Sequence, residues 1–152
     1  MLEQQPPVFR LTVQFEDVDA NGVVHHPNYL KYLERARSYS IKKGGYSVER
    51  ILSSYSALVV TEIHAKYLRP ALLDQELFVI SRVDAVGKSL IKICQFITPN
   101  LPTDEEIETV EEKLSLPEMI LWAQISLVYV DLKSAKPKSI PQELKQAIKM
   151  NN

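Results

Sequence analysis

The sequence predicts an α+β domain in which one long helix packs against a five-stranded antiparallel sheet, and two observations support this. Residues 28–43 carry apolar or small side chains at helical spacing, with Tyr29, Leu33, Ala36 and Ser40 on one stripe. Most of the remaining chain has the alternating or β-branched pattern of strands. A strand, a helix and then four strands, mostly joined as hairpins, place the helix on one face of a sheet.

The first strand is expected at Val8–Phe15, an apolar run that leads into a polar loop. The long helix is expected to begin at about Pro27, because the fixed φ of proline suits a first helical turn. It is expected to end at Gly44–Gly45. A short second helix is expected from about Ser47 to Ser53.

The other strands follow from period-two patterns. In Thr61–Tyr67 apolar and polar residues alternate, which predicts a half-buried strand. Leu77–Val86 and Leu90–Ile97 flank Gly87–Ser89, a hairpin turn signal. Met119–Val130 is the predicted final strand.

Two further segments bear on the surface of the domain. The stretch Ala57–Arg69 reads as a long exposed edge strand, which a second copy of the chain would cover, so a homodimer or homotetramer is expected. The segment Pro99–Pro117 contains six acidic residues and is expected to be a solvated insertion with a helical turn.

Composition limits the classes of function. The chain has 152 residues, 45% of them hydrophobic and 24% charged, as expected for one globular domain, here residues 1–152. A net charge of -1 gives no global attraction to nucleic acid or to an anionic membrane. Cys94 is the only cysteine, so no intrachain disulfide can form, and a buried core position is expected for it. With no signal-peptide pattern at the N-terminus and no membrane-length apolar run, a cytoplasmic location is expected.

The most informative segment is Asp17–Tyr29, which combines two acids, a glycine turn and a proline-started helix. It places a carboxylate just before a helix N-terminus, where free N–H groups and the helix dipole stabilise negative charge. A carboxylate facing such a helix end can attack or hydrate a carbonyl group. This segment is therefore the predicted active site.

Residues Phe15–Arg37 resemble hotdog-fold acyl-CoA thioesterases of the 4-hydroxybenzoyl-CoA thioesterase type, which include the YbgC-like enzymes. The shared pattern is D-x-D-x-x-G-(V/I)-V, a short run to a tyrosine, and then E-R-A-R. Tyr67–Ala71 and Lys136–Leu144 fit later segments of the family more weakly. The resemblance implies a five-stranded sheet wrapped around one long central helix, dimerisation by continuous sheet pairing, and active sites at the subunit interface.

The resemblance also implies roles for single residues. Asp19 is implied as the catalytic carboxylate, acting either as nucleophile or as the base that activates water. The backbone N–H of His26 is implied to polarise the thioester carbonyl, and Gly22 to permit the tight turn. The neighbouring Val23, His25 and Tyr29 are expected to contact substrate.

Two features depart from the family pattern. His25 stands where relatives usually carry Tyr or Trp, so the wall of the acyl pocket is expected to differ. The acidic segment is longer than the simple connection expected at that place.

Simpler interpretations compete with some of these assignments. Asp17 and Asp19 are residues that turns favour, and Asp17 is expected to be structural. His25, His26 and His64 have no accompanying carboxylate spacing, so no metal site is predicted, and no cofactor is implied. The phosphates of coenzyme A require cations, for which Lys88, Lys136 and Lys138 are candidates unless they are ordinary surface lysines.

The predicted function is hydrolysis of an acyl-CoA to the free acid and CoA. The acyl group is expected to be aromatic, such as 4-hydroxybenzoyl or 1,4-dihydroxy-2-naphthoyl, or a short aliphatic chain. One alternative is a hotdog dehydratase acting on hydroxyacyl thioesters. Those enzymes rely on a histidine together with an acid on or near the helix, whereas here the acid precedes the helix in the D-x-D loop. The other is a module that binds acyl-CoA or an acyl-carrier protein without turnover.

Overall fold

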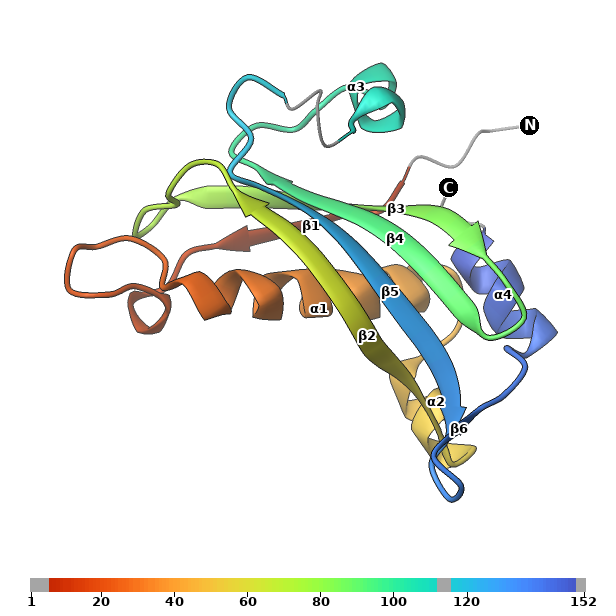
Figure 1. Ribbon diagram of the computed structural model, residues 1–152. Coiled ribbons are helices and arrows are strands. Elements are labelled where there is room, and N and C mark those ends of the chain that lie inside the picture. The colour runs from red at the N-terminus through yellow and green to blue at the C-terminus, as the bar shows by residue number, and fades with distance from the viewer. Residues whose placement is uncertain (1–5, 112–115, 150–152) are drawn as a thin grey trace.

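A curved antiparallel sheet wraps around one long helix, α1 (His26–Lys43), in the computed structural model, which describes residues 6–111 and 116–149 (Figure 1). The sheet order is β1-β3-β4-β5-β2, with β6 paired to β5. The strands are β1 (Val8–Thr12), β2 (Ser56–Tyr67), β3 (Glu76–Val86), β4 (Leu90–Thr98), β5 (Leu121–Asp131) and the two-residue β6 (Lys136–Pro137). The shorter helices are α2 (Val48–Ser53), α3 (Asp104–Thr109) and α4 (Gln142–Lys149). The predicted α+β class and the five long strands around one helix are confirmed, and β6 was not predicted.

Helix α1 is the centre of the inner core. Its predicted stripe buries Tyr29, Leu33 and Ala36 against the sheet, and Tyr32 is buried as well. At its C-terminus a Cβ added to Gly44 would lie 2.1 Å from the carbonyl oxygen of Ala147 in α4. The glycine therefore ends α1 and also allows the backbone of α4 to pack directly against it.

The predicted hairpin between β3 and β4 is confirmed. The N–H of Gly87 donates to the carbonyl of Leu90 at 2.7 Å and closes the turn. The pairing of β2 with β5 is less local, since these strands are separated by β3, β4 and α3 in the sequence. It aligns Ser56 with Asp131 at one end and Tyr67 with Leu121 at the other.

Two strand predictions need correction. The first strand ends at Thr12, because the carboxylate of Asp17 accepts the N–H of Gln14 and closes a 3-10 turn at Phe15–Asp17. The segment Thr61–Tyr67 is a strand, but its predicted half-burial is wrong: within it only Ala65 is partly buried. The reason is that β2 is an edge strand, as expected for Ala57–Arg69, and pairs on one side only among the described residues.

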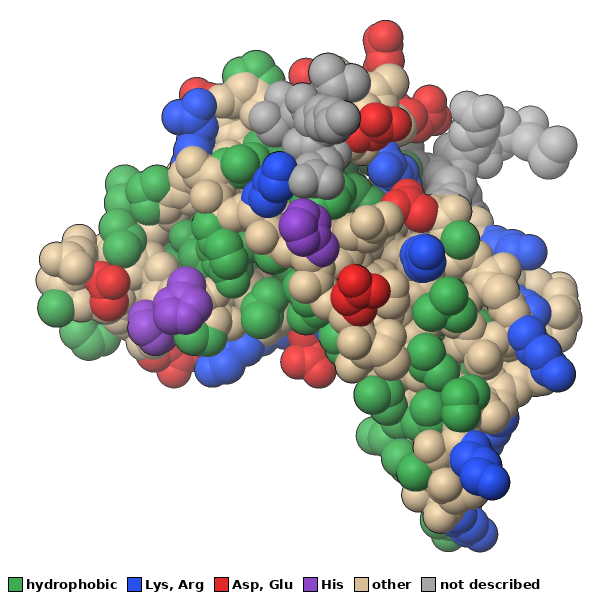
Figure 2. All heavy atoms as spheres, in the orientation of Figure 1, with side chains coloured by type: hydrophobic (Ala, Val, Ile, Leu, Met, Phe, Trp, Pro, Cys, Tyr) green, Lys and Arg blue, Asp and Glu red, His purple; other side chains and the backbone are tan. Residues whose placement is uncertain are grey.

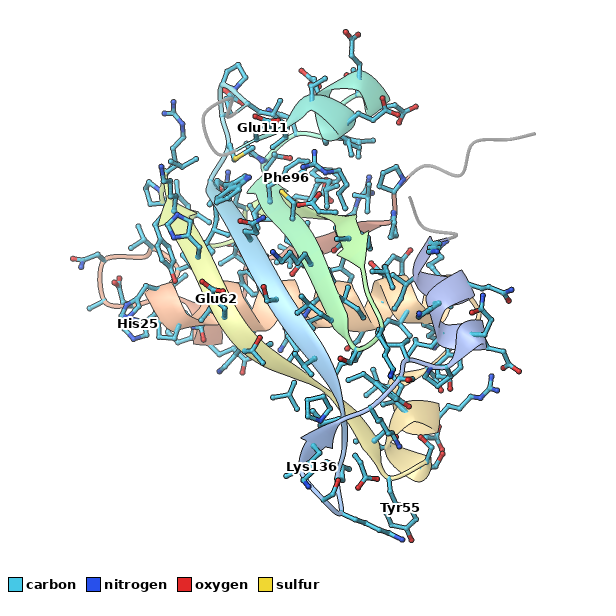
Figure 3. All side chains as sticks on the ribbon, turned by 45° about the vertical axis from the view of Figure 1, so that its right-hand side comes forward. His25, Tyr55, Glu62, Phe96, Glu111 and Lys136 are labelled. Atoms are coloured by element: carbon cyan, nitrogen blue, oxygen red, sulfur yellow. The ribbon has the colours of Figure 1, made fainter. Side chains whose placement is uncertain are left out.

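The acidic segment is not simply solvated, which corrects the prediction. Helix α3 begins with a capping box between Thr103 and Glu106; Ile107 in the helix and Val110 directly after it are 2% and 1% exposed. They pack over the outer face of the sheet, as Figure 3 shows for the neighbourhood of Glu111 and Phe96. The buried residues of this outer cluster are Phe78, Ile80, Cys94, Phe96, Ile107, Val110, Met119 and Trp122. Four positions of the predicted insertion, 112–115, lie outside the described residues.

Burial of Cys94 is confirmed, and this burial raises the pKa of its thiol to about 11. The thiol is therefore protonated at neutral pH. No helix in the described part of the chain is both long and apolar enough to cross a membrane.

Candidate active site

The predicted active-site loop is a tight turn just before α1. The N–H of Asp19 donates to the carbonyl of Val23 at 2.9 Å, and the N–H of Gly22 returns to the carbonyl of Asp19 at 3.0 Å. Gly22 has a φ of 75°. This backbone conformation is energetically unfavourable for residues that carry a side chain. Val18 and Val24 form an antiparallel bridge at the base of the turn. The glycine is thus required by the shape of the loop.

The loop is attached to the segment that connects β2 to β3. The N–H of Val24 donates to the carbonyl of Ala71 at 2.9 Å, and half-buried Val23 forms a bridge with Leu72. Tyr29, from the first turn of α1, is buried, and its hydroxyl accepts the N–H of Ala71 at 2.9 Å. These contacts hold the loop and the start of the helix in a fixed relation.

The two acids of the loop have different environments. Asp17 is partly buried; its carboxylate accepts from Gln14, and its carbonyl accepts both the N–H of His25 and the amide of Asn28, each at 2.9 Å. It therefore joins the turn to the helix. Buried Tyr32, which the sequence did not single out, lies near Asp17, and its own burial and that carboxylate raise the pKa of its hydroxyl.

Asp19, in contrast, is exposed. One carboxylate oxygen accepts the N–H of Asn21 at 2.8 Å, which fixes the side chain in an Asx turn. Its second oxygen has no hydrogen-bond donor among the described residues. This oxygen is available to react with a ligand or to bind water.

His26 is the first residue of α1, and its backbone N–H has no acceptor within the described residues. Pro27 follows and has no N–H, and the N–H of Asn28 turns back to the carbonyl of His25 at 2.9 Å. The hydroxyl of Tyr67 at the end of β2 donates to the carbonyl of His26 at 3.3 Å. The N–H of His26 therefore remains as a donor at the positive end of the helix dipole.

The imidazoles of His25 and His26 are both exposed, with ring centroids 4.8 Å apart in an edge contact (Figure 2). In the described part of the chain, no three His, Cys, Asp or Glu side chains gather closely enough to hold a metal ion.

The structure divides the predicted site residues into two groups. His25 lies at the start of α1, whereas Lys136 lies at the other end of the sheet (Figure 3). Tyr67 contacts His26 at one end of β2, and Ser56 at the other end aligns with Asp131, the partner of Lys136. Eleven strand steps correspond to roughly 36 Å. One protomer therefore does not bring its loop and these lysines together.

Lys88 and Lys138 belong to the group at the far end. Lys88 is exposed in the β3–β4 turn, where its carbonyl accepts the N–H of Ile140 at 2.8 Å. The ammonium of Lys138 lies 3.8 Å from Asp131 and 5.5 Å from the centre of the Tyr129 ring. Basic side chains are prominent along the side of the molecule that carries α4 and β6 (Figure 2).

A cavity of about 180 Å³ lies between the second half of α1, α2 and the inner side of the sheet. The sequence did not indicate this cavity, because its walls come from seven separate elements. Its polar lining includes Arg37 and Ser81. Arg37 belongs to the E-R-A-R stretch, which contributed to the family resemblance but did not indicate a cavity.

The sequence pattern of the thioesterase-like superfamily matches residues 13–148. The chain belongs to this superfamily. Acyl-CoA thioester hydrolase YbgC of Escherichia coli is 29% identical over 87% of each chain, and acyl-CoA thioesterase YbgC of Haemophilus influenzae is 30% identical over 91% of each. The 1,4-dihydroxy-2-naphthoyl-CoA thioesterase of Synechocystis shares the fold, with a TM-score of 0.76, 20% identity and 93% coverage of both chains. The resemblance to hotdog thioesterases and the prediction of a thioester hydrolase are confirmed.

Proposed function

We propose that this protein hydrolyses acyl-CoA thioesters to the free acid and CoA. The observation that carries the proposal is the pairing of an exposed Asp19 carboxylate with the unpaired N–H of His26 at a helix N-terminus. The activity of the YbgC relatives supports the same reaction class.

The chemistry follows from these two groups. A thioester carbonyl oxygen placed on the N–H of His26 gains a hydrogen bond that strengthens as negative charge develops on that oxygen. The free oxygen of Asp19 then either attacks the carbonyl carbon, giving an acyl-enzyme anhydride that water cleaves, or takes a proton from the attacking water. Both routes break the carbon–sulfur bond, release CoA as the thiol, and leave the acyl group as a carboxylic acid.

The remaining loop residues then have supporting roles. Gly22 permits the turn, Val23 anchors it to Leu72, and Tyr29 positions the helix start through Ala71 rather than contacting substrate with its hydroxyl. The imidazole of His25 is exposed beside the loop and is proposed to line the entrance to the active site.

The active unit is proposed to be a homodimer formed through β2. The free edge of β2 carries exposed apolar side chains, including Val59, Val60 and Ile63, which a second copy would cover. Antiparallel pairing of two β2 strands aligns the Tyr67 end of one protomer with the Ser56 end of its partner. The loop of one protomer thereby meets the end of the partner that carries Lys88, Lys136 and Lys138, the proposed cations for the CoA phosphates.

The cavity between α1, α2 and the sheet is proposed to receive the acyl group, and its volume then limits the size of that group. An engineered apolar cavity of about 150 Å³ binds benzene, and the cavity here is of similar size. One aromatic ring or a short aliphatic chain fits this volume best. The Synechocystis structural neighbour acts on an aromatic acyl-CoA, which is consistent with the aromatic choice.

A thiol-detecting assay over a panel of acyl-CoA substrates tests the function, with Asp19→Asn as the matched variant. We expect thiol release by the wild type and its loss in the variant. Binding of acyl-CoA without thiol release would instead support a binding module, and loss of water from a hydroxyacyl thioester would support a dehydratase. The same panel carried on an acyl-carrier protein would identify the preferred thioester donor.

A further inference from the structure

The outer face of the sheet carries an apolar patch that the proposed reaction does not use. Four of its large side chains are at most 6% exposed: Phe78, Ile80, Phe96 and Trp122. Residues 101–111, here called the outer cap, lie over this patch (Figure 3). We propose that the outer cap closes the outer face against a second dimer, so that the protein assembles through β2 alone. This inference rests on the homodimer of the proposed function.

The outer cap is a fitted part of the fold. Its two buried residues, Ile107 and Val110, belong to the same apolar cluster as the patch. The Nη1 of Arg82 on β3 lies within 2.9–3.1 Å of three backbone carbonyl oxygens of the cap. After the cap, the carbonyl of Pro117 accepts a hydrogen bond from the Nη2 of Arg69 at 2.9 Å. Side-chain packing and hydrogen bonds to the backbone therefore hold the cap on the sheet.

The outer face becomes polar beyond the cap. Side chains alternate along a strand, so Gln124 shares the face of Trp122 on β5, and Lys92 shares that of Cys94 on β4. On β2, His64 is aligned with Gln124. Gln124, Lys92 and His64 are all exposed. The apolar part of the outer face thus coincides with the part that the cap covers, and the rest offers no apolar surface for a second sheet.

An uncovered patch would favour association with a second copy of the chain. Two sheets with apolar faces pack against each other about 10 Å apart, and a symmetric oligomer can supply the same face twice. The outer cap occupies the space that the second sheet would need. Its solvent side carries the exposed acids Asp104, Glu105 and Glu108, and acidic side chains gather over α3 (Figure 2). Face-to-face approach of two copies would bring these like charges together, which is unfavourable.

The test releases the cap and measures the size of the assembly by light scattering. Ile107→Glu places an unpaired carboxylate in the apolar contact, which is costly and should free the cap. Trp122 is the only tryptophan, so its emission reports on the cover of the patch. At low concentration the variant should be a dimer with emission at longer wavelength than the wild type. At high concentration its mass should double and the emission should return towards that of the wild type, because the patch is covered again.

Leu101→Glu is the matched control. It introduces the same charge into the same segment, but at a leucine that is 59% exposed. This variant and the wild type should both remain dimers with unchanged emission over the whole concentration range.

A wild type larger than a dimer at micromolar concentration would overturn the inference. A folded Ile107→Glu protein with exposed Trp122 and a mass that never exceeds that of the wild type would also overturn it. If Ile107→Glu does not fold, Arg82→Met, which loosens the cap, takes its place under the same criteria. A monomeric wild type whose Ile107→Glu variant associates would contradict the β2 dimer but support the outer cap. Thiol release from acyl-CoA is measured separately, so failure of the proposed reaction is distinguished from failure of this inference.

Discussion

Arg37 and Arg82 lie on opposite sides of the sheet and differ in the number of hydrogen-bond acceptors that they contact. Adjacent residues of β3, Ser81 and Arg82, point to the inner and outer faces. On the inner side, Ser81 joins the network of Gln95 and Arg37 beside the cavity. On the outer side, Arg82 contacts the acidic segment around α3 directly.

The outer arginine, Arg82, contacts four acceptors among the described residues. Its Nη1 lies within 2.9–3.1 Å of the carbonyl oxygens of Ile107, Glu108 and Val110, and its Nε donates to Asp84 at 3.1 Å. Arg82 therefore fastens the end of α3 to the sheet, whereas Arg37, beside the cavity, contacts one acceptor, Gln95, among the described residues. The difference shows that partial burial does not by itself determine how many hydrogen-bond acceptors an arginine contacts. Backbone carbonyls supply three of the four acceptors of Arg82, which gives this arginine a structural role.

The largest effect is expected for the two acids of the active-site loop, of which Asp19 is proposed to react and Asp17 to hold the loop. Asp19→Asn keeps the acceptor oxygen for Asn21 but removes the nucleophile or base, so we expect kcat to fall by at least about 100-fold with little change in unfolding free energy. Asp17→Asn, which keeps an acceptor for Gln14, is the matched control and should keep kcat within a few-fold. Steady-state kinetics with thermal unfolding checks both, and the reverse result would exchange the roles of the two acids.

The second prediction tests whether the outer face is structural. Arg82→Met should lower the free energy of unfolding by about 2 kcal/mol, because it removes charge-assisted hydrogen bonds to several carbonyls. kcat/KM should change less than about two-fold at a temperature where the variant is folded.

Arg10→Met is the control for this variant. Arg10 is an exposed arginine with a 3.8 Å ion pair to Glu76, and its removal should change stability by less than about 1 kcal/mol. Urea unfolding measures both variants. Loss of activity in folded Arg82→Met would mean that the outer segment also controls the active site.

Sequence reasoning predicted the elements whose signals are local. Pro27 and Gly44 mark the ends of α1, and Gly87 marks the β3–β4 turn, since each of these residues determines the backbone by its own conformation or size. The Asp17–Tyr29 loop could be predicted for the same reason, because its acids, its glycine and the start of the helix lie close together in the sequence.

Features that depend on contacts between distant segments could not be predicted from the sequence. The alternation in Thr61–Tyr67 could not indicate that β2 lies at an edge, because that depends on its pairing with β5. The charges around Ile107 and Val110 concealed two buried residues, since a charged run is ordinarily solvated. The environment of Arg37 depends on Gln95, 58 residues away, so only the folded chain shows which acceptor its guanidinium contacts among the described residues.

A smaller effect is expected at the far end of the sheet. Lys88→Ala should raise KM about two- to five-fold and leave kcat nearly unchanged, because an exposed cation contributes uniform binding to the CoA phosphates. The effect should decrease with added salt. Lys92→Ala, an exposed lysine on β4, is the control. A KM that is unchanged in Lys88→Ala but still depends on salt would move the phosphate site to Lys136 and Lys138, and a KM that does not depend on salt would contradict a cationic site.

The central claim is that each active site combines Asp19 of one protomer with the cavity of its partner. Co-expression of two differently tagged chains, one Asp19→Asn and the other Ile41→Trp, which fills the cavity, gives heterodimers that can be purified by both tags. Each parent homodimer should be nearly inactive, whereas the heterodimer should recover about half of the wild-type activity, because one of its two sites combines intact parts. A pure heterodimer that is as inactive as its parents would contradict the account.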